Sequence, residues 1–111
     1  MASNAFKRHG VYWVELDPAR GRELRKTRPG VIVSRDELND AIDTVVVCPL
    51  AGTLHPSWPT RLQIKIAGKE TEIAVDQIRV VSKERLKGRL GELTSGQAAR
   101  LREILHSTYA D

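Results

Sequence analysis

The amino-acid sequence predicts a small, mainly β fold, in which a strongly bent antiparallel sheet or barrel is closed by one C-terminal helix. Three observations support this. Short β-branched runs separated by turn residues dominate the chain as far as residue 93. From Thr94 onward, apolar residues instead recur at the spacing of one helical face. The 111 residues are the length of one domain, and we treat residues 1–111 as one domain.

The first elements are predicted from alternating strand and turn signals. The run Val11–Leu16 is β-branched and aromatic, and the turn residues Asp17–Gly21 end it. The polar segment Arg22–Pro29 is expected to be a long loop before a buried strand at Gly30–Ser34. Ser34 and Glu37 have the spacing of a capping box, which predicts a short helix or a single turn.

The middle of the chain predicts a central strand and a hairpin. Thr44–Leu50 is the most apolar run, and Pro49 should interrupt its ladder because proline has no N–H to donate. Ala51–Pro59 is expected to be a second long loop. Arg61–Ile66 alternates polar and apolar residues like a half-exposed strand, and Ala67–Glu70 is its hairpin turn.

The last quarter combines short strands with the closing helix. Glu72–Val75 and Gln77–Val81 are expected to be strands, Ser82–Arg85 a turn of helix, and Arg89–Leu93 a weak strand. Thr94-x-x-Gln97 is a capping box that opens the final helix. The apolar positions of that helix are Ala98, Leu101, Ile104, Leu105 and Tyr109.

Composition and charge restrict the classes of function. Eighteen Lys and Arg against fourteen Asp and Glu give a formal net charge of +4, which favours a polyanionic partner, either nucleic acid or an acidic protein. Mild basicity for solubility is the alternative. One cysteine and three histidines exclude an intrachain disulfide and a Cys-rich zinc site. No apolar run spans a bilayer and the first residues lack an apolar signal, so we expect a cytoplasmic protein.

Two loops carry the residues that are suited to chemistry. The first contains Arg20, Arg22, Arg25, Lys26 and Arg28 around Glu23, and it is either a phosphate-binding surface or a solvated basic loop. Pro29 restrains the backbone at Arg28, and the cations keep Glu23 ionised. A chain this short cannot form a deep cleft, so any site should be shallow or shared between copies.

The second loop contains Thr53, His55 and Trp58 beside Arg61. His55 suits proton transfer, and Trp58 offers a face on which an unpaired base stacks. Their alternatives are a loop histidine bonded to backbone and a tryptophan that caps the core. Asp76 is either a turn residue or a buried carboxylate held by hydrogen bonds.

The ordered combination of several segments resembles the MazF/PemK/Kid family of toxins from bacterial toxin–antitoxin pairs. The matching segments are residues 10–18, 21–23, 27–34, 45–50 and 75–79. The resemblance implies an SH3-like barrel, paired as a homodimer that binds single-stranded RNA in a groove across the dimer. It also implies ribosome-independent cleavage without metal or cofactor, products with 2′,3′-cyclic phosphate and 5′-hydroxyl ends, and an acidic antitoxin that blocks the groove. No membrane partner is expected.

Residue roles follow from the same resemblance. Arg28 matches the family's arginine before proline, and a guanidinium suits stabilisation of the charged phosphorane. Glu23 and Asp76 match family acids and rank equally as the base that accepts the 2′-hydroxyl proton, with His55 third. Arg20, Arg22, Arg25, Lys26, His55, Trp58 and Arg61 are the expected RNA-binding residues.

Ala51 departs from the family pattern, which usually has a threonine whose hydroxyl helps to hold the scissile phosphate. Loss of one such donor costs about 2–4 kcal/mol of transition-state stabilisation. Three accounts remain open: Thr53 takes over because Gly52 permits the movement, backbone N–H groups replace the hydroxyl, or the protein is attenuated. We favour reduced or altered activity.

Two other functions compete with the ribonuclease. Because of Ala51, one alternative is that the chain is a catalytically dead homologue that binds RNA or titrates antitoxin. A toxin of the same fold that targets a protein, resembling the gyrase poison CcdB, would need neither Arg28 nor the basic loop. For the ribonuclease, the antitoxin's acidic segment is expected to cover Arg20–Arg28.

Overall fold

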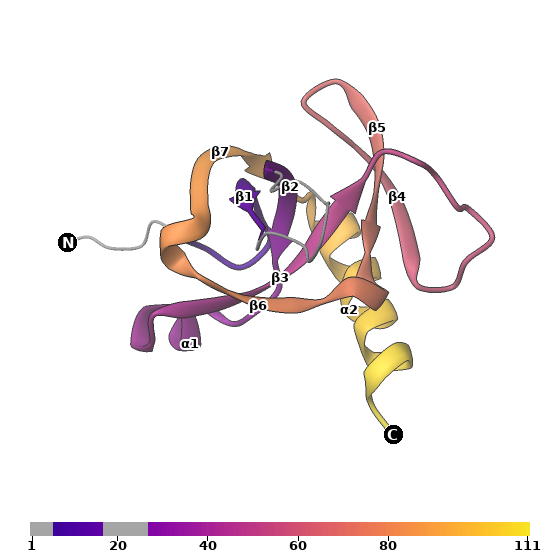
Figure 1. Cartoon of the computed structure of the whole chain (residues 1–111). Coiled ribbons are helices and arrows are strands. Elements are labelled where there is room, and N and C mark those ends of the chain that lie inside the picture. Colours follow the sequence, from indigo (N-terminus) through magenta and orange to yellow (C-terminus); the bar gives the residue numbers. More distant parts are fainter. Residues whose placement is uncertain (1–5, 17–26) are drawn as a thin grey trace, which may run out of the picture.

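The computed structural model describes residues 6–16 and 27–111, and it shows a curled antiparallel sheet with a long C-terminal helix (Figure 1). In chain order the elements are β1 (Gly10–Glu15), β2 (Thr27–Ile32), α1 (Asp36–Ala41), β3 (Thr44–Ala51), β4 (Arg61–Ile66), β5 (Lys69–Ala74), the 3₁₀ turn η1 (Val75–Gln77), β6 (Arg79–Ser82), the 3₁₀ turn η2 (Lys83–Arg85), β7 (Leu86–Glu92) and α2 (Ser95–Tyr109). The mainly β class with a C-terminal helix is thus confirmed. No helix among these residues is long and apolar enough to cross a membrane.

Strand β3 organises the sheet because it changes partners along its length. The strands are ordered β4-β5-β3-β2-β1-β7, and β6 also pairs with β3. Along one edge of β3, Thr44–Val47 pair with β6 and Leu50–Ala51 pair with β5. Pro49, which has no N–H, lies in the gap between these two partners, while the other edge of β3 still pairs with β2 at Gly30. The expected interruption is therefore an exchange of partner that bends the sheet and brings β5 and β6 together.

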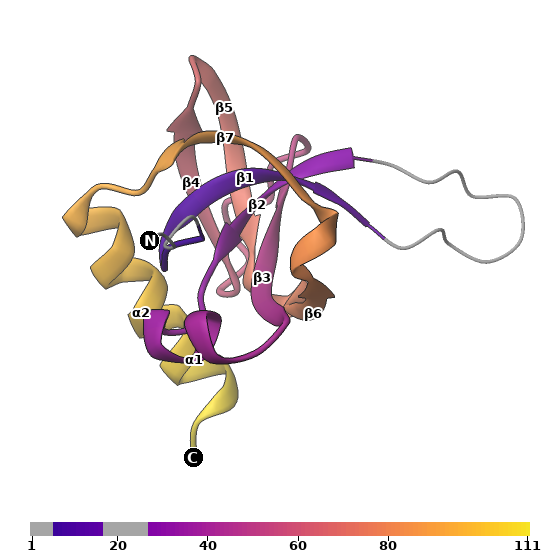
Figure 2. The same cartoon turned by 90° about the vertical axis from the view of Figure 1, so that its left-hand side faces the viewer.

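The curled sheet, in which β1 and β7 arch as Figure 2 shows, packs against two hydrophobic cores. Neighbouring residues of one strand point into different cores, because side chains alternate across a strand. Val11, Val31 and Cys48 pack in the core that α2 covers, whereas Tyr12, Ile32 and Val47 pack in the other. The two cores explain why the runs Gly30–Ser34 and Thr44–Leu50 are apolar almost throughout.

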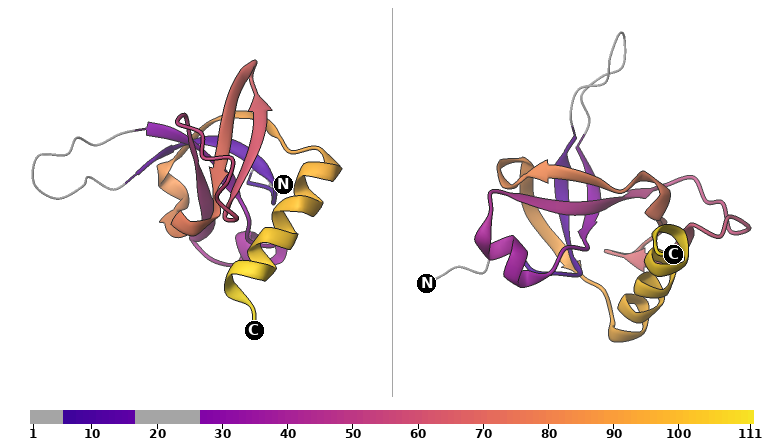
Figure 3. Two further views of the ribbon diagram at one scale, coloured as in Figure 1. Left: turned by 90° about the vertical axis from the view of Figure 1, so that its right-hand side faces the viewer. Right: turned by 90° about the horizontal axis from the view of Figure 1, so that it is seen from below.

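Helix α2 begins as the capping box predicts. The Thr94 hydroxyl accepts from the Gln97 N–H at 3.1 Å, and the Gln97 side chain accepts from the Thr94 N–H at 2.9 Å. Leu101 and Ile104 are buried against the sheet, and α2 packs beside β4 and η1 (Figure 3). Tyr109 is half exposed, but its hydroxyl donates to the Val75 carbonyl at 2.7 Å and ties the end of α2 to η1.

Several local predictions were wrong; Val75 and Gln77, for example, were expected in strands but belong to the 3₁₀ turn η1. Thr27–Pro29 belong to β2, since they pair with Glu15–Trp13 of β1 rather than forming a loop. Ser34 caps no helix: its hydroxyl donates to Asn39 and accepts from the Val46 N–H, so it ties α1 to β3 instead. The hairpin turn is shorter than expected, because Ala67 and Gly68 adopt positive φ angles of 52° and 81° and let β5 start at Lys69.

Candidate functional site

A polar pocket of about 340 Å³ opens where β3 ends, between β2, β6 and the loop 52–60. Long-range pairing builds it: β2 contributes Arg28, β3 ends in Ala51, and β6 begins with Arg79. The described lining residues are Leu16, Arg28, Pro49, Leu50, Ala51, Gly52, Thr53, His55, Arg61, Ala74, Gln77 and Arg79. That lining includes three arginines and no carboxylate, so the pocket suits an anion.

The three arginines differ in how far their charge is already neutralised. Arg61 forms ion pairs with Glu72 at 2.5 Å and with Asp76 at 2.8 Å. Within residues 6–16 and 27–111, Arg28 and Arg79 form ion pairs with no acidic residue. Arg28 and Arg79 are thus the two described cations of the pocket whose charge is left for a ligand.

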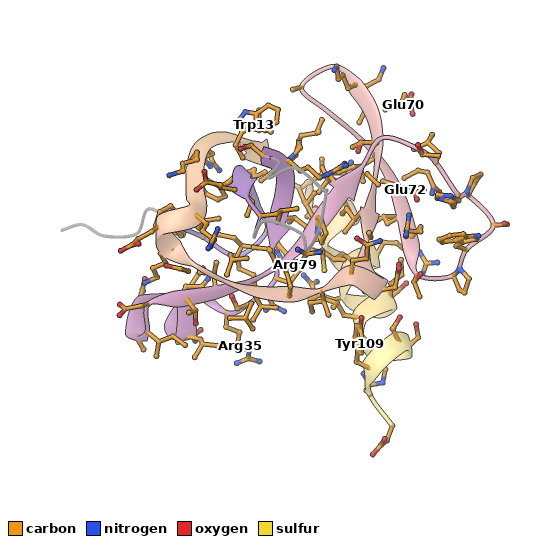
Figure 4. The ribbon with its side chains drawn as sticks, viewed as in Figure 1. Trp13, Arg35, Glu70, Glu72, Arg79 and Tyr109 are labelled. Carbon is orange, nitrogen blue, oxygen red and sulfur yellow. The ribbon has the colours of Figure 1, made fainter. Side chains whose placement is uncertain are left out.

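A buried carboxylate, Glu72, lies behind the pocket. Its side chain is fully buried on β5, beside the loop that joins β3 to β4 (Figure 4). One oxygen, Oε1, accepts from the His55 backbone N–H and from Gln63 Nε2, both at 2.7 Å. The other, Oε2, accepts from the Arg61 guanidinium and lies 3.1 Å from His55 Nδ1. Both oxygens of Glu72 are therefore saturated by groups that surround the pocket.

These contacts set the protonation of both carboxyl groups. Burial alone raises the pKa of Glu72, but the hydrogen bonds from His55, Arg61 and Gln63 outweigh it and lower that pKa to about 2. The Arg61 guanidinium, helped by the Thr60 hydroxyl, lowers the pKa of Asp76 to about 2 against a smaller effect of burial. Asp76 is hence ionised at neutral pH and accepts hydrogen bonds from Arg61 and Thr60.

The loop 52–60 carries an ordered aromatic stack. The rings of His55 and Trp58 lie 3.9 Å apart and almost parallel, at 21°. The Arg61 guanidinium carbon lies 4.6 Å from the centre of the Trp58 ring. Trp58 is nevertheless 44% exposed, so part of the indole still faces solvent. The predicted stacking residue is thus held by side chains and does not cap the core.

The position of the missing threonine lies at the pocket wall. Ala51 is the last residue of β3, and its carbonyl accepts from the Thr71 hydroxyl at 2.8 Å. Thr53 is exposed and lines the same pocket two residues later. A Cβ built on Gly52 would meet no atom within 4 Å, so the backbone between them has open space around it.

The structure gathers some of the predicted site residues and leaves others aside. Arg28, Ala51, Thr53, His55 and Arg61 meet in one pocket. Asp76 and Trp58 join it through Arg61 rather than through its lining. The remaining predicted residues, Arg20, Arg22, Glu23, Arg25 and Lys26, lie outside the described residues.

Sequence reasoning missed three members of the site, namely Glu72, Gln77 and Arg79. Glu72 was placed in a strand without a role. Its only signal was a carboxylate directly before the apolar run Ile73–Val75, in a segment expected to be a strand, where a buried carboxylate requires compensating hydrogen bonds. Gln77 and Arg79 belong to the segment Val75–Arg79 that the resemblance had already matched.

A second hollow of about 340 Å³ adjoins the first and is mainly apolar in its lining. It shares Arg28, Leu50 and Gly52 with the polar pocket. Trp13, 39% exposed on β1, and Leu90 of β7 belong to its wall. The side chain of Arg28 accordingly lies between two depressions of different polarity.

Comparisons with known proteins agree with this geometry. The family model described as "PemK-like, MazF-like toxin of type II toxin-antitoxin system" matches residues 7–109. The endoribonuclease MazF9 of Mycobacterium tuberculosis is 33% identical over 110 residues, which cover 88% of this chain and 92% of that protein.

Two solved structures share the fold. A MazE–MazF crystal structure from Deinococcus radiodurans matches with a TM-score of 0.80 at 19% identity, over 96% of each chain. An endoribonuclease in complex with its cognate antitoxin, from a mycobacterial species, matches with a TM-score of 0.76 at 24% identity, over 91% of each chain. Because the family model covers nearly the whole chain, this protein belongs to the PemK-like, MazF-like toxins of type II toxin–antitoxin systems.

Proposed function

We propose that this chain is a sequence-selective, ribosome-independent endoribonuclease that cleaves single-stranded RNA. The observation that carries the proposal is the pocket around Arg28 and Arg79, two cations with no acidic partner among the described residues, in a lining without carboxylates. Two guanidiniums converging on one hollow suit a phosphodiester, which accepts bidentate hydrogen bonds. Membership of a family with relatives named endoribonucleases supports the same reading.

The proposed reaction is attack of the 2′-hydroxyl on the adjacent phosphate. The new O–P bond forms as the bond to the 5′-oxygen breaks. A base accepts the 2′-hydroxyl proton and the leaving 5′-oxygen takes up a proton from solvent, which gives a 2′,3′-cyclic phosphate and a 5′-hydroxyl. Arg28 stabilises the negative charge of the phosphorane, and Arg79 supplies a second positive charge across the pocket. The reaction needs no metal, because these residues supply the positive charge.

The geometry ranks the candidate bases. Asp76 holds hydrogen bonds from Arg61 and Thr60, and a pKa of about 2 makes it a weak proton acceptor. His55 lines the pocket and has its Nδ1 beside Glu72, which orients the ring. We therefore propose Glu23 or His55, ahead of Asp76, as the base that accepts the 2′-hydroxyl proton.

The two hollows around Arg28 suit the nucleotides on the two sides of a scissile phosphate. A phosphodiester must have a neighbour on each side, and Arg28 lies where the polar pocket and the apolar hollow meet. The apolar wall at Trp13 suits a nucleobase, and the polar pocket suits a ribose with its hydroxyl groups.

The partners follow from charge and size. We propose a cytoplasmic homodimer, because a shallow surface on so small a chain becomes an RNA groove when two copies adjoin. An antitoxin with an acidic segment would compete with RNA for Arg20–Arg28. Reversing the charge of Arg28 with Arg28→Glu should weaken both RNA and antitoxin binding, and an unchanged antitoxin affinity would contradict a shared surface.

The test is cleavage of a long single-stranded RNA by purified protein, with EDTA present and ribosomes absent. We expect discrete cuts with cyclic-phosphate and 5′-hydroxyl ends, lost in Arg28→Ala. Arg35→Ala is the matched control, because Arg35 lines a separate shallow depression with Arg8 and Glu37 and is absent from the lining of the polar pocket, so cleavage should be unchanged. RNA binding without cleavage would indicate the catalytically dead homologue. A protein that neither cleaves nor binds RNA would refute the proposal.

A further inference from the structure

We propose that Glu72 is a positioning residue for RNA recognition: it locks the His55–Trp58 stack into a preformed platform for one nucleobase. The inference rests on the proposed ribonuclease function and adds a residue that touches no RNA itself. It also assigns base selectivity to the loop 52–60, on the side of the pocket opposite the apolar hollow at Trp13.

The middle of the loop is attached to β5 through Glu72. Its carboxylate holds the backbone of the loop through the His55 N–H at 2.7 Å and contacts the His55 ring at 3.1 Å. The same carboxylate binds Arg61, the first residue of β4, and Gln63 fixes its other side. Because the Glu72 side chain is fully buried, water cannot replace these bonds without opening the strand.

The consequence is an indole that has one face covered and is still substantially exposed. His55 Nδ1 and an Arg61 guanidinium nitrogen lie 3.3 Å apart, so both groups lie on the same side of Trp58. Trp58 is 44% exposed in spite of these contacts, so much of its surface is accessible to a base. A base that stacks there meets a ring whose orientation is already set, and little side-chain entropy is lost on binding.

The negative charge of Glu72 is essential to this arrangement. A glutamine has the same shape, but its NH2 group would face donors in either orientation: the Arg61 guanidinium on one side, or the His55 N–H and Gln63 on the other. The hydrogen bonds on one of these two sides would be lost, and the His55 ring would no longer have a carboxylate beside it. Glu72→Gln should therefore free the stack while leaving both hydrophobic cores intact.

The experiment is an abasic scan of RNA binding. The RNA carries the mapped cleavage motif with a 2′-deoxy sugar at the scissile nucleotide, so it binds without being cut. Removing the base that stacks on Trp58 should weaken binding to the wild-type protein by about 5- to 150-fold, the range for one base–aromatic stack. In Trp58→Leu, this loss of affinity (the abasic penalty) should vanish at one nucleotide. That nucleotide is the one whose base stacks on Trp58.

In Glu72→Gln, removing the base at that nucleotide should likewise no longer weaken binding. Removing a base at any other nucleotide should weaken binding as much as it does for the wild-type protein. Glu72→Gln should also relax base preference in the cleavage map at that position only. Glu103→Gln, the same charge change on the exposed surface of α2, is the control and should behave as wild type. A merely structural role of Glu72 would weaken binding uniformly along the RNA, and that result would overturn the inference.

A second variant keeps the test decisive if Glu72→Gln does not fold. His55→Ala removes the ring that covers Trp58 and leaves the buried ion pair of Arg61 with Glu72 in place. It should abolish the penalty at the same nucleotide, and a retained penalty would refute the locked stack. A wild-type protein that cleaves RNA but shows no position-specific penalty overturns this inference alone, whereas one that neither binds nor cleaves RNA overturns the proposed function as well.

Discussion

Replacing Arg61 by leucine should destabilise the protein more than any exposed ion-pair substitution. The change leaves Glu72, fully buried, without its cationic partner, and it removes two hydrogen bonds from Asp76. Removing one member of a buried pair costs about 3–5 kcal/mol, because an uncompensated charge stays in the interior. Small domains have a total stability of only about 5–15 kcal/mol, so the loss is a large part of the whole.

The matched control is Arg89→Leu. Arg89 forms an ion pair with Glu92 at the same 2.8 Å distance that separates Arg61 from Asp76, but the two side chains are 50% and 71% exposed. An exposed pair of this kind contributes about 0–1 kcal/mol. Both variants remove one guanidinium and add one leucine, so their difference isolates the effect of burial.

The assay is urea unfolding followed by circular dichroism at neutral pH. With a urea dependence of about 1–3 kcal/mol per molar, a loss of about 3–5 kcal/mol in Arg61→Leu should lower the midpoint by roughly 1–5 M. The loss should shrink at acidic pH, where Glu72 can take up a proton and no longer leaves a buried charge. Equal losses in the two variants, within about 1 kcal/mol, would refute the electrostatic account of the Glu72 cluster.

Three further outcomes are expected. The free energy of unfolding should fall as the pH drops from about 4.5 toward 2. The reason is that the pKa values of Glu72 and Asp76 are about 2 in the folded protein and near 4.5 and 3.8 in the unfolded chain. Urea titrations across this pH range should show a smaller fall in Glu72→Gln than in the wild-type protein. Leu101→Ala, at a fully buried position of α2, should cost about 2–5 kcal/mol in the same assay, whereas Leu54→Ala at a 39% exposed position should cost far less. Ala51→Thr should raise kcat/KM for RNA cleavage by about 30- to 1,000-fold if the hydroxyl is the missing donor; an unchanged rate would show that Thr53 or the loop backbone already supplies it.

The sequence alone determined the elements whose signals are local. Helix α2 starts at Thr94 because the capping box and the apolar spacing lie within the helix itself. The β4–β5 hairpin follows from the alternation of Arg61–Ile66 and from the turn residues after it. Arg28, His55 and Trp58 were singled out by residue type and position, and the family resemblance added Ala51 as a departure worth testing.

Tertiary structure decided what depends on pairing over long distances in the chain. Ser34 has the spacing of a helix cap, yet its hydroxyl binds Val46 because β3 passes beside it. The partner exchange of β3 brings Arg79 of β6 and Ala51 to one pocket with Arg28 of β2. Glu72 gained its role only when β5 paired with β4 and placed a buried carboxylate against Arg61, Gln63 and His55, since a charge inside a strand is stable only where the fold supplies its partners.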